Sequence, residues 1–526
     1  MRTAPGRADA VIGHVVARHA EQRPDIICTT FADGSAWTWA QARAQLWHAA
    51  GVLADHGVRP GDHVLILLPN GAPYLRAWWA VTALGAVMVP VHTAYRGEML
   101  RHICRDSGAK LVIADPELTA RLDEIDTALE RVDPAVLAGE SDTPPAGPPV
   151  EPWDIATVNY TSGTTGPAKG VVTPHLQTYY GGRDVFGARA GLRPDDRWLV
   201  DLPLFHVAAQ QITLAALSVG ASIAVRPLFD GRDYWGCIRS ARATFSLLAG
   251  TMGGFLLARP EQPSDRGHGL RTIVAAPIVA DHRGFLERFG IAEMVTAFGS
   301  TETGAPTIGY SRDGLPEGTC GRPRDGITLR LVDAHDHEVP VGDVGEMIMR
   351  TERPWELNQG YHGRPEATVA AWRNGWFHTG DSFRRDAEDN YFFVDRLRDS
   401  LRRRGENISS FQVEHAVAAH RSVAEAACVA YPGSYGEDDV KVFVVPTEGA
   451  EVDFAALLEF LADRLAHYAV PRYFELIDAL PMTTTKRVRK GELRDLGNSA
   501  RTWDRERHGF TVGRAGLVRT SVKEQS

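Results

Sequence analysis

The chain has 526 residues, more than one hydrophobic core normally serves, so two or more domains are expected. Hydrophobic residues make up 44% and charged residues 23% of the sequence, as in ordinary globular enzymes. A formal net charge of −9 argues against a nucleic-acid-binding protein, because binding to a phosphate backbone needs a concentrated basic surface.

Strand and helix patterns alternate through the first third of the chain. Apolar residues at helical spacing predict an amphipathic helix at the start, and continuous apolar runs between turns are typical of buried parallel strands. The alternation predicts an α/β fold with a mainly parallel sheet. The expected helices cover residues 9–22, 40–56, 72–84 and 96–107, and the expected strands cover residues 63–68, 86–91, 110–114 and 155–160.

The pattern changes further along the chain. Residues 133–152 are rich in Pro, Gly, Asp and Ala and predict a loop. A helix is expected over 207–219 and a strand over 221–225, whereas alternating residues between 326 and 350 predict antiparallel strands. The cluster of His335, His337 and Glu338 is interpreted as a polar hairpin turn and not as a metal site, because no matching ligand pair lies nearby.

A loop rich in glycine and hydroxyl side chains follows the strand at 155–160. Glycine lets backbone N–H groups turn inward around an anion, and a lysine adds a positive charge suited to phosphate. A Walker A loop does not fit, because Ala168 precedes the lysine and Gly170 follows it. We therefore predict a phosphate site formed by Thr161, Ser162, Gly163, Thr164, Thr165, Gly166 and Lys169.

Two later segments supply the other parts of a nucleotide site. In residues 297–304, Phe298 offers a flat apolar face for the base, Thr301 a phosphate donor and Glu302 a carboxylate for Mg²⁺. Asp381 comes directly after a glycine turn, where a carboxylate can accept hydrogen bonds from both ribose hydroxyls.

The order of these segments resembles the AMP-forming adenylating superfamily, which includes acyl-CoA synthetases, luciferases and the adenylation domains of peptide synthetases. Residues 160–171 are similar to its phosphate loop and residues 298–302 to its aromatic-Gly-x-Thr-Glu motif. The resemblance implies a large N-terminal domain over residues 1–398, made of parallel sheets flanked by helices with a small β-barrel-like part. It also implies a small, mobile α+β lid domain over residues 399–526.

The resemblance assigns roles to further residues. His206 occupies the place of an aromatic or histidine gate beside the acyl pocket, and the segment from Asp395 to Ile408 matches the hinge motif, ending as acyl-CoA ligases do. The other implied positions are the adenine loop with Ala275, Ala276 and Pro277, Gly299 of the aromatic-Gly-x-Thr-Glu motif, the ribose or phosphate contacts Arg396 and Arg402, the pivot Asp399, and the CoA side with Gly405, Glu406 and Asn407.

The last motif departs from the superfamily. Residues 480–490 correspond to a segment that usually reads Pro-x-Thr-x-x-Gly-Lys-Ile. In this alignment Lys486 falls on the glycine, and Arg487 falls on the lysine that bridges carboxylate and phosphate. Arginine keeps the positive charge but differs in shape and reach. Lys486 and Lys490 are open alternatives for delivering an ammonium group.

The implied function is a ligase reaction in two steps. ATP and Mg²⁺ would activate a small organic or aryl carboxylic acid to an acyl-AMP with release of pyrophosphate, and CoA would then form the thioester. Segments 93–101 and 355–361 look most like the crotonobetaine/carnitine-CoA ligase branch. Two alternatives stay open: an enzyme that activates nitrous acid for transfer to an aryl amine, and a non-catalytic nucleotide binder.

The remaining expectations concern the setting and the end of the chain. Five widely spaced cysteines, the lack of a signal-like apolar stretch after the N-terminus and the absence of any long apolar window predict a cytoplasmic protein without a membrane span. We expect a monomer or homodimer with a small acid as its substrate. Helices are expected over 410–420 and 453–466 and a strand over 440–445. The basic tail from residue 501 to residue 526 is expected to be a surface extension or, equally, to support dimer contacts.

Overall fold

Strands and helices alternate through the N-terminal part of the chain, as the sequence predicts. The computed structural model describes residues 5–125, 127–161, 167–249, 252–257, 259–276, 278–279, 281–396, 400–403, 406–433, 437–481, 488, 490–514 and 516–519. A six-stranded sheet has the order β6-β5-β3-β4-β7-β8 and is parallel except for the edge strand β8. Its strands are β3 (His63–Leu67), β4 (Val87–Pro90), β5 (Leu111–Ala114), β6 (Glu130–Val132), β7 (Ile155–Thr161) and β8 (Lys169–Pro174).

A second, nine-stranded sheet has the order β15-β14-β13-β12-β11-β9-β10-β1-β2. Its central strands pair in parallel, and antiparallel strands stand at both edges. Its strands are β1 (Ile27–Thr30), β2 (Ala36–Thr38), β9 (Arg197–Val200), β10 (Ser222–Val225), β11 (Phe245–Ala249), β12 (Thr272–Ala276), β13 (Glu293–Ser300), β14 (Gly304–Tyr310) and β15 (Arg322–Pro323).

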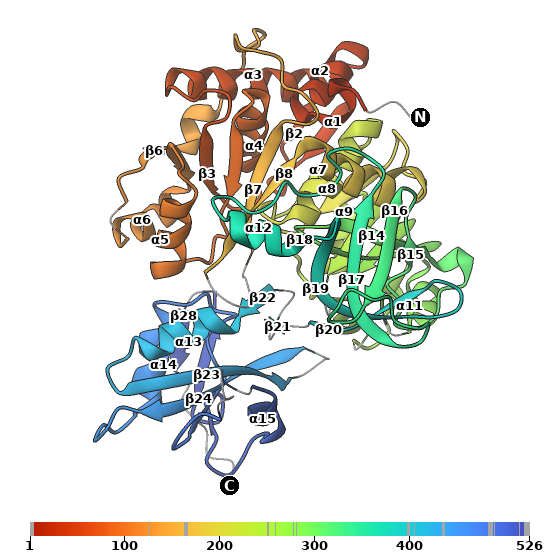
Figure 1. Cartoon of the computed structure of the whole chain (residues 1–526). Helices are drawn as coiled ribbons and strands as arrows, with labels where there is room; N and C mark the ends of the chain where they lie inside the picture. Colours follow the sequence, from red (N-terminus) through yellow and green to blue (C-terminus); the bar gives the residue numbers. More distant parts are fainter. Residues whose placement is uncertain are drawn as a thin grey trace.

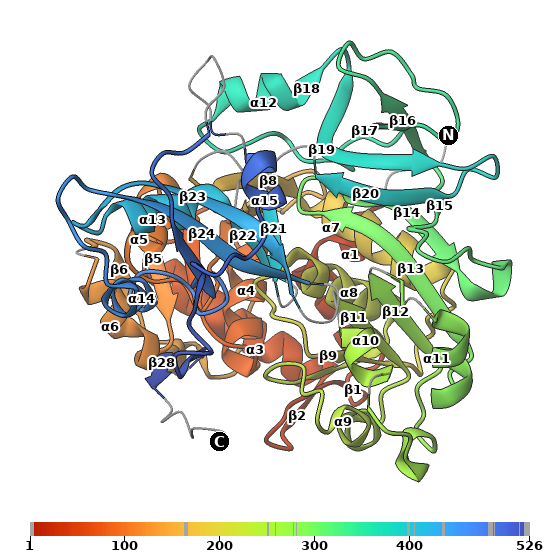
Figure 2. The same ribbon diagram turned by 90° about the horizontal axis from the view of Figure 1, so that it is seen from below.

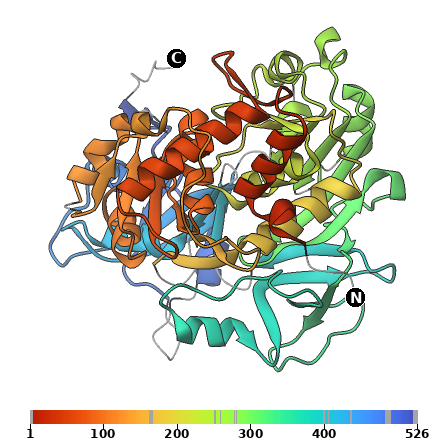
Figure 3. The ribbon, with the colours of Figure 1, turned by 90° about the horizontal axis from the view of Figure 1, so that it is seen from above.

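Both sheets are buried on two faces, which explains the continuous apolar runs in their strands. In β3, Val64 and Ile66 face a core shared with the nine-stranded sheet, and Leu65 and Leu67 face the opposite side. Figure 3 shows helices that cross between the two halves of the N-terminal domain, one built on each sheet. The shared core takes side chains from α1 (Arg7–Ala10), α2 (Ile12–Gln22), α3 (Trp39–Asp55), α4 (Ala72–Ala83), α7 (His175–Gly182) and α8 (Val207–Val219).

Other helices cover the outer faces of the two sheets. They are α5 (Gly97–Asp106) and α6 (Thr119–Asp123) on the six-stranded sheet, and α9 (Tyr234–Ala241), α10 (Met252–Leu257) and α11 (His282–Phe289) on the nine-stranded sheet. Short 3-10 turns lie at Pro116–Leu118, Pro134–Leu137, Pro263–Asp265 and Ser311–Asp313, and a π-helical turn at Arg183–Ala188. None of the helices in the described part of the chain is long and apolar enough to cross a membrane.

A five-stranded antiparallel sheet follows and confirms the strands predicted between 326 and 350. It contains β16 (Ile327–Val332), β17 (Val344–Thr351), β18 (Trp372–Arg373), β19 (Trp376–Arg385) and β20 (Tyr391–Arg396), with α12 (Pro365–Ala371) before β18. The polar hairpin turn is also confirmed, because the carboxylate of Asp333 accepts hydrogen bonds from the backbone N–H groups of His335 and His337 at 2.8 and 3.0 Å.

A smaller C-terminal domain, blue in Figure 1, has its own sheet and core, which confirms the predicted α+β class. The predicted boundary between residues 398 and 399 stays a prediction, since Asp399 lies outside the described residues. The elements are the hairpin β21 (Ser400–Arg403) and β22 (Glu406–Ser409), the sheet strands β23 (Val423–Pro432), β24 (Asp438–Pro446), β25 (Tyr473–Leu476) and β26 (Trp503–Asp504), the helices α13 (Ser410–Ala418), α14 (Phe454–Ala462) and α15 (Lys490–Asp495), and the hairpin β27 (Phe510–Gly513) and β28 (Gly516–Arg519).

The prediction that the tail from residue 501 is a surface extension was wrong for residues 503–512, and its alternative role in dimer contacts stays a prediction. Residues 503–504 form β26, which pairs with β25, and Phe510 and Val512 are buried in the C-terminal core. Arg505 is only 1% exposed, and its guanidinium donates to the backbone oxygens of Val470 and Pro471 at 2.9 and 3.2 Å. A hydrogen-bonded guanidinium can be buried, so a basic composition did not mean an exposed segment.

The carboxyl group of Asp201, directly after β9, makes stability depend on pH. Asp201 is 3% exposed, and burial raises its pKa from 3.8 to about 7, opposed by its own backbone N–H and by the charge of Arg226. Because the folded pKa is the higher one, ionisation destabilises the fold as pH rises from about 4 to 7, and the loss then levels off.

We therefore expect Asp201→Asn to leave stability nearly unchanged at pH 4 and to increase it at pH 8, by about 4 kcal/mol at most. The measurement is the shift of the urea unfolding midpoint at the two pH values. Asp230→Asn, at an exposed position, is the control. An equal shift at both pH values would contradict the assignment of the buried charge.

Candidate active site

The predicted phosphate loop connects β7 and β8 at the edge of the six-stranded sheet. Thr161 ends β7 and pairs with Lys169, the first residue of β8. Close contact at the base of this hairpin requires glycine, because a Cβ on Gly170 would lie 2.5 Å from the side chain of Val158. The hairpin therefore has a defined base. The loop residues Ser162, Gly163, Thr164, Thr165 and Gly166 lie outside the described residues.

Helix α5 holds both sides of this hairpin. The hydroxyl of Tyr160 donates to Asp106 Oδ2 at 2.8 Å, and the Nε2 of His102 lies 2.8 Å from the carbonyl oxygen of Ala168 and donates to it. On the other side, the ammonium of Lys169 lies 5.1 Å from the ring centroid of Tyr361, a cation–π distance. Lys169 is thus directed toward the segment that contains Tyr361.

Glu302 follows β13 and is positioned through its backbone. The side-chain amide of Gln177 donates to the backbone carbonyl oxygens of Thr301 and Glu302 at 2.9 and 3.3 Å. The side-chain amide of Asn358 also donates to the backbone carbonyl oxygen of Glu302, at 2.8 Å. The hydroxyl of Tyr361 donates to Glu302 Oε1 at 3.3 Å. Tyr361 therefore contacts both the phosphate-loop hairpin and the carboxylate predicted to hold the metal.

A magnesium ion fits the chemistry of this carboxylate. Within the described ranges, Glu302 Oε2 has no hydrogen-bond partner, and no three His, Cys, Asp or Glu side chains gather as a ready-made metal cluster. Magnesium is usually held by one or two carboxylates together with substrate phosphates and water. Glu302 can supply such a carboxylate.

The turn after Phe298 leaves no room for a side chain at Gly299. A Cβ on Gly299 would lie 2.4 Å from the backbone oxygen of Gly304, on the next strand. We expect Gly299→Ala to displace the Phe298–Glu302 segment and to weaken ATP binding at least about tenfold, measured by calorimetric titration. Gly51→Ala, in α3 with open space around the new Cβ, is the control. Unchanged ATP affinity in the Gly299 variant would contradict this packing argument.

The predicted base and ribose contacts lie where two sheets meet. The ring of Phe298 packs edge-on against Phe383, with centroids 4.8 Å apart, and nearly parallel to Phe393 at 6.2 Å. Asp381 is 5% exposed, its backbone N–H donates to Thr379 Oγ1 at 3.1 Å, and it stands opposite Arg396 in the β19–β20 pairing. Of the predicted adenine loop, Ala275 and Ala276 end β12 beside β13, and Pro277 lies outside the described residues.

The C-terminal domain contacts the large domain through the hairpin β21–β22, which lies at the junction in Figure 1. The Nε2 of His92 lies 3.2 Å from Glu406 Oε1. The Nδ1 of the same ring accepts from the N–H of Ala94 at 3.0 Å, so the ring proton sits on Nε2 and is donated to Glu406. The ring of His92 also packs against Phe205 at 4.3 Å and against Tyr468 of the smaller domain at 5.3 Å.

Glu406 is charged at this junction. Burial raises the pKa of its carboxyl, but the hydrogen bond from His92, with further electrostatic help from His206 and His467, outweighs burial and lowers the pKa below its ordinary value. His206, the predicted gate, is exposed at the N-terminus of α8, where its Nδ1 accepts from the N–H of Ala208 at 3.3 Å. His206 and Glu406 are therefore neighbours across the junction.

The other predicted lid residues are only partly located. Arg402 pairs with Asn407 in the β21–β22 register. Lys490 begins α15, where its ammonium donates to Ser410 Oγ at 2.7 Å and forms an ion pair with Glu414 at 2.6 Å. In this arrangement Lys490 is engaged within its own domain. Asp399, Gly405, Lys486 and Arg487 lie outside the described residues.

Comparison with known proteins agrees with this geometry. Residues 16–362 match the family described as AMP-binding enzyme, and residues 412–487 match the AMP-binding enzyme C-terminal domain. The chain belongs to the AMP-binding enzyme family. This membership makes it an AMP-forming ligase, as the order of its motifs predicts.

Two relatives of this AMP-binding enzyme are CoA ligases by name. The chain is 34% identical over 468 residues to a feruloyl-CoA synthase of an Amycolatopsis species, covering 88% of this chain and 94% of the relative. It is 29% identical over 485 residues to the crotonobetaine/carnitine–CoA ligase of Citrobacter koseri, covering 87% and 93%.

Solved structures show the same fold. The o-succinylbenzoate CoA synthetase of Bacillus subtilis, as a double mutant with a product analogue bound, matches with a TM-score of 0.80 at 24% identity, covering 91% of this chain and 98% of that one. The same synthetase in complex with AMP matches with a TM-score of 0.68 at 24% identity, covering 93% and 99%.

Sequence reasoning missed four residues of this site: Gln177, Asn358, Tyr361 and His92. Asn358 and Tyr361 lie in the segment 355–361, whose similarity to one branch of ligases was a usable signal. Gln177 lies in a buried helix and His92 follows a strand, and neither position has a motif of its own. Their roles follow from contacts with residues far away in the sequence.

Proposed function

We propose that this AMP-forming ligase activates a small organic or aryl carboxylic acid with ATP and Mg²⁺ and then transfers the acyl group to the thiol of CoA. The observation that carries the proposal is the position of Tyr361. Its ring lies under Lys169 of the phosphate-loop hairpin, and its hydroxyl donates to Glu302. One side chain therefore joins the predicted phosphate site to the predicted metal carboxylate.

In the first half-reaction, a carboxylate oxygen of the acid attacks the α-phosphorus of ATP, and the bond from that phosphorus to pyrophosphate breaks. Lys169, Thr161 and Thr301 would bind phosphate oxygens, and Glu302 would hold Mg²⁺, which would neutralise phosphate charge. Phe298, beside Ala275 and Ala276, supplies the face for adenine, and Asp381 accepts from the ribose hydroxyls. Arg487, Lys486 and Lys490 remain the candidates for the bridging cation, and Arg396 and Arg402 for further ribose or phosphate contacts.

In the second half-reaction, the thiol sulfur of CoA bonds to the acyl carbon as the bond from that carbon to the AMP oxygen breaks. The contact between Glu406 and His92 supports a lid position suited to this step. The higher TM-score against the synthetase with a product analogue, 0.80 compared with 0.68 for the AMP complex, supports the same interpretation. The segment with Gly405, Glu406 and Asn407 then borders the path of the incoming thiol.

The substrate class rests on the relatives and on the gate. The relatives act, by their names, on crotonobetaine or carnitine and on a feruloyl group. Crotonobetaine, carnitine and the acid that carries the feruloyl group are all small carboxylic acids. This supports a small organic or aryl acid as the substrate of this chain. His206, exposed at the N-terminus of α8, is proposed to border the acyl pocket. We place the enzyme in the cytoplasm, a location supported by its five free cysteine thiols.

The deciding experiment measures AMP release with crotonobetaine, ferulate, benzoate and octanoate, each with and without CoA, and with nitrite plus an aryl amine. We expect AMP together with an acyl-CoA in the presence of at least one acid and CoA. AMP formed only with nitrite would favour activation of nitrous acid, which the arginine at position 487 keeps open. No AMP under any condition would favour a non-catalytic nucleotide binder.

A further inference from the structure

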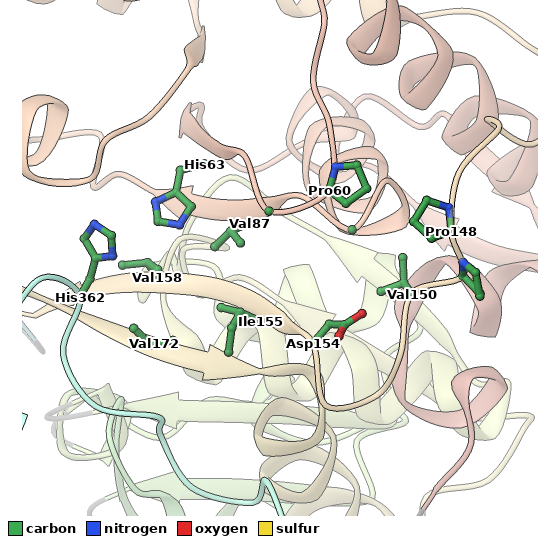
Figure 4. Close-up of a pocket in the computed structure, with 13 residues that line it drawn as sticks. Pro60, His63, Val87, Pro148, Val150, Asp154, Ile155, Val158, Val172 and His362 are labelled. Carbon is green, nitrogen blue, oxygen red and sulfur yellow. The ribbon is translucent and has the colours of Figure 1, made fainter.

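A cavity of about 400 Å³ lies at the end of the six-stranded sheet opposite to the phosphate loop (Figure 4). Three of its lining residues, His63, Val87 and Ile155, are the first residues of the parallel strands β3, β4 and β7. The phosphate loop follows the last residue of β7. The cavity is therefore separate from the nucleotide site, although one strand reaches both.

The walls of the cavity are mainly apolar. Prolines 60, 148 and 149 and five branched aliphatic side chains line it, among them Val150, Val158 and Val172. Small-molecule sites in proteins usually enclose about 300–1,000 Å³ and are lined by apolar groups with a few polar ones. This cavity has the size and the lining of a site for a small apolar molecule.

The polar groups of the cavity are separated in space. His63 and His362 face each other at one end, with ring centroids 4.9 Å apart, and Asp154 lies toward the other end, as Figure 4 shows. The Nδ1 of His63 donates to the carbonyl oxygen of Ser107 at 2.6 Å, so its Nε2 is an acceptor in the neutral ring and donates to a ligand only when the ring is protonated. Across the described chain, no residue forms a hydrogen bond with the ring nitrogens of His362.

We propose that this cavity binds an apolar carboxylic acid, with its carboxylate between His63 and His362 and its hydrocarbon body along the aliphatic wall. Burial and, to a lesser extent, the neighbouring His362 lower the pKa of His63, and a bound carboxylate favours the protonated ring that donates to it. Asp154 repels an anion from the opposite end and so fixes the orientation of the ligand. The proposal therefore rests on the placement of two imidazoles at one end of the cavity, a carboxylate toward the other end and an apolar wall along it.

Occupancy of this cavity is connected to the nucleotide site through the backbone. The N–H of His362 donates to the carbonyl oxygen of Gly170 at 2.7 Å, and Val172 exchanges hydrogen bonds with residues 359 and 360 at 2.9 and 3.0 Å. Tyr361 lies between these anchors and donates to Glu302. A ligand that displaces His362 therefore moves the segment that touches both Lys169 and Glu302, and we expect it to change the affinity for ATP.

The test uses 4-fluorobenzoate as the probe, followed by ¹⁹F NMR titration of the full chain. We expect a saturable binding component that weakens about tenfold or more in His362→Ala, which removes one imidazole from the carboxylate end. Ile155→Trp, which fills the cavity, should lose the same component. The controls are His335→Ala, at an exposed hairpin turn, and Ile27→Trp, at a position on β1 that is 44% exposed.

The possible outcomes distinguish ligand binding in the cavity from the effect of that binding on the affinity for ATP. The absence of binding in the wild-type chain, or binding that persists unchanged in both cavity variants, would overturn the site. Binding lost in the cavity variants and retained in the two controls supports it. The dissociation constant of ATP is then measured with and without saturating probe. A change that disappears in His362→Ala supports the coupling, and an unchanged constant overturns the coupling while the binding site stands.

Discussion

Glu302→Gln is expected to lower the rate of acyl-AMP formation by about 10²–10³, which is the usual loss when one preorganised electrostatic group is removed from an active site. The substituted amide keeps the size of the side chain but cannot hold Mg²⁺ as a carboxylate does. The fold should be unaffected, because Gln177 and Asn358 hold this position through the backbone oxygens of Thr301 and Glu302. Pyrophosphate release in single turnover measures the effect.

The matched control for this substitution is Glu352→Gln, at an exposed position of the same domain. We expect its rate to equal that of the wild type. Tyr361→Phe adds an intermediate test, since it removes the hydroxyl that donates to Glu302 Oε1 and leaves the ring beside Lys169. Near-normal pyrophosphate release by Glu302→Gln would refute the assignment of this carboxylate to the metal.

Glu406→Gln is expected to slow thioester formation by about 10–100-fold and to leave acyl-AMP formation nearly unchanged. The reason is that Glu406 accepts a charge-assisted hydrogen bond from His92 across the domain junction. A neutral amide weakens this contact, so the population of the docked lid falls. Rates of ATP–pyrophosphate exchange and of CoA-dependent AMP release, measured side by side, separate the two half-reactions.

The charge of Glu406 also fixes the pH range of this prediction. Its pKa lies below the ordinary value of 4.5, so the contribution of the hydrogen bond from His92 to the ionised carboxylate is present above that value and is lost only as pH falls through the lowered pKa. The effect of Glu406→Gln should therefore persist across about pH 5.5–8.

The control for the lid substitution is Glu425→Gln, exposed on β23 of the same domain. The double variant Glu406→Gln/His92→Gln should be little worse than either single variant, because both substitutions break the same contact. Equal losses in both half-reactions would instead indicate general damage to the lid and would contradict the docking role. Figure 2 shows that β21 and β22 lie where the C-terminal domain covers the large one.

The local elements of the fold could be predicted because their causes are local. The run Val64–Leu68 is apolar throughout, since β3 packs on both faces, and the helix expected over 207–219 has those bounds in the structure. The site motifs were likewise recognisable, because a phosphate loop depends on glycines and hydroxyls that are consecutive in the chain. The tail after residue 501 was misjudged, because its charged residues obscured the buried Phe510 and Val512.

The sequence by itself determined the α/β class, the order of the nucleotide-site motifs and the identity of Glu302 as the expected metal carboxylate. Only the tertiary structure decided what holds that carboxylate and what the lid touches. Gln177 contacts Thr301 across a separation of 124 residues, and His92 contacts Glu406 across 314. No periodicity or motif encodes such pairs, because they form only when distant strands and helices pack together.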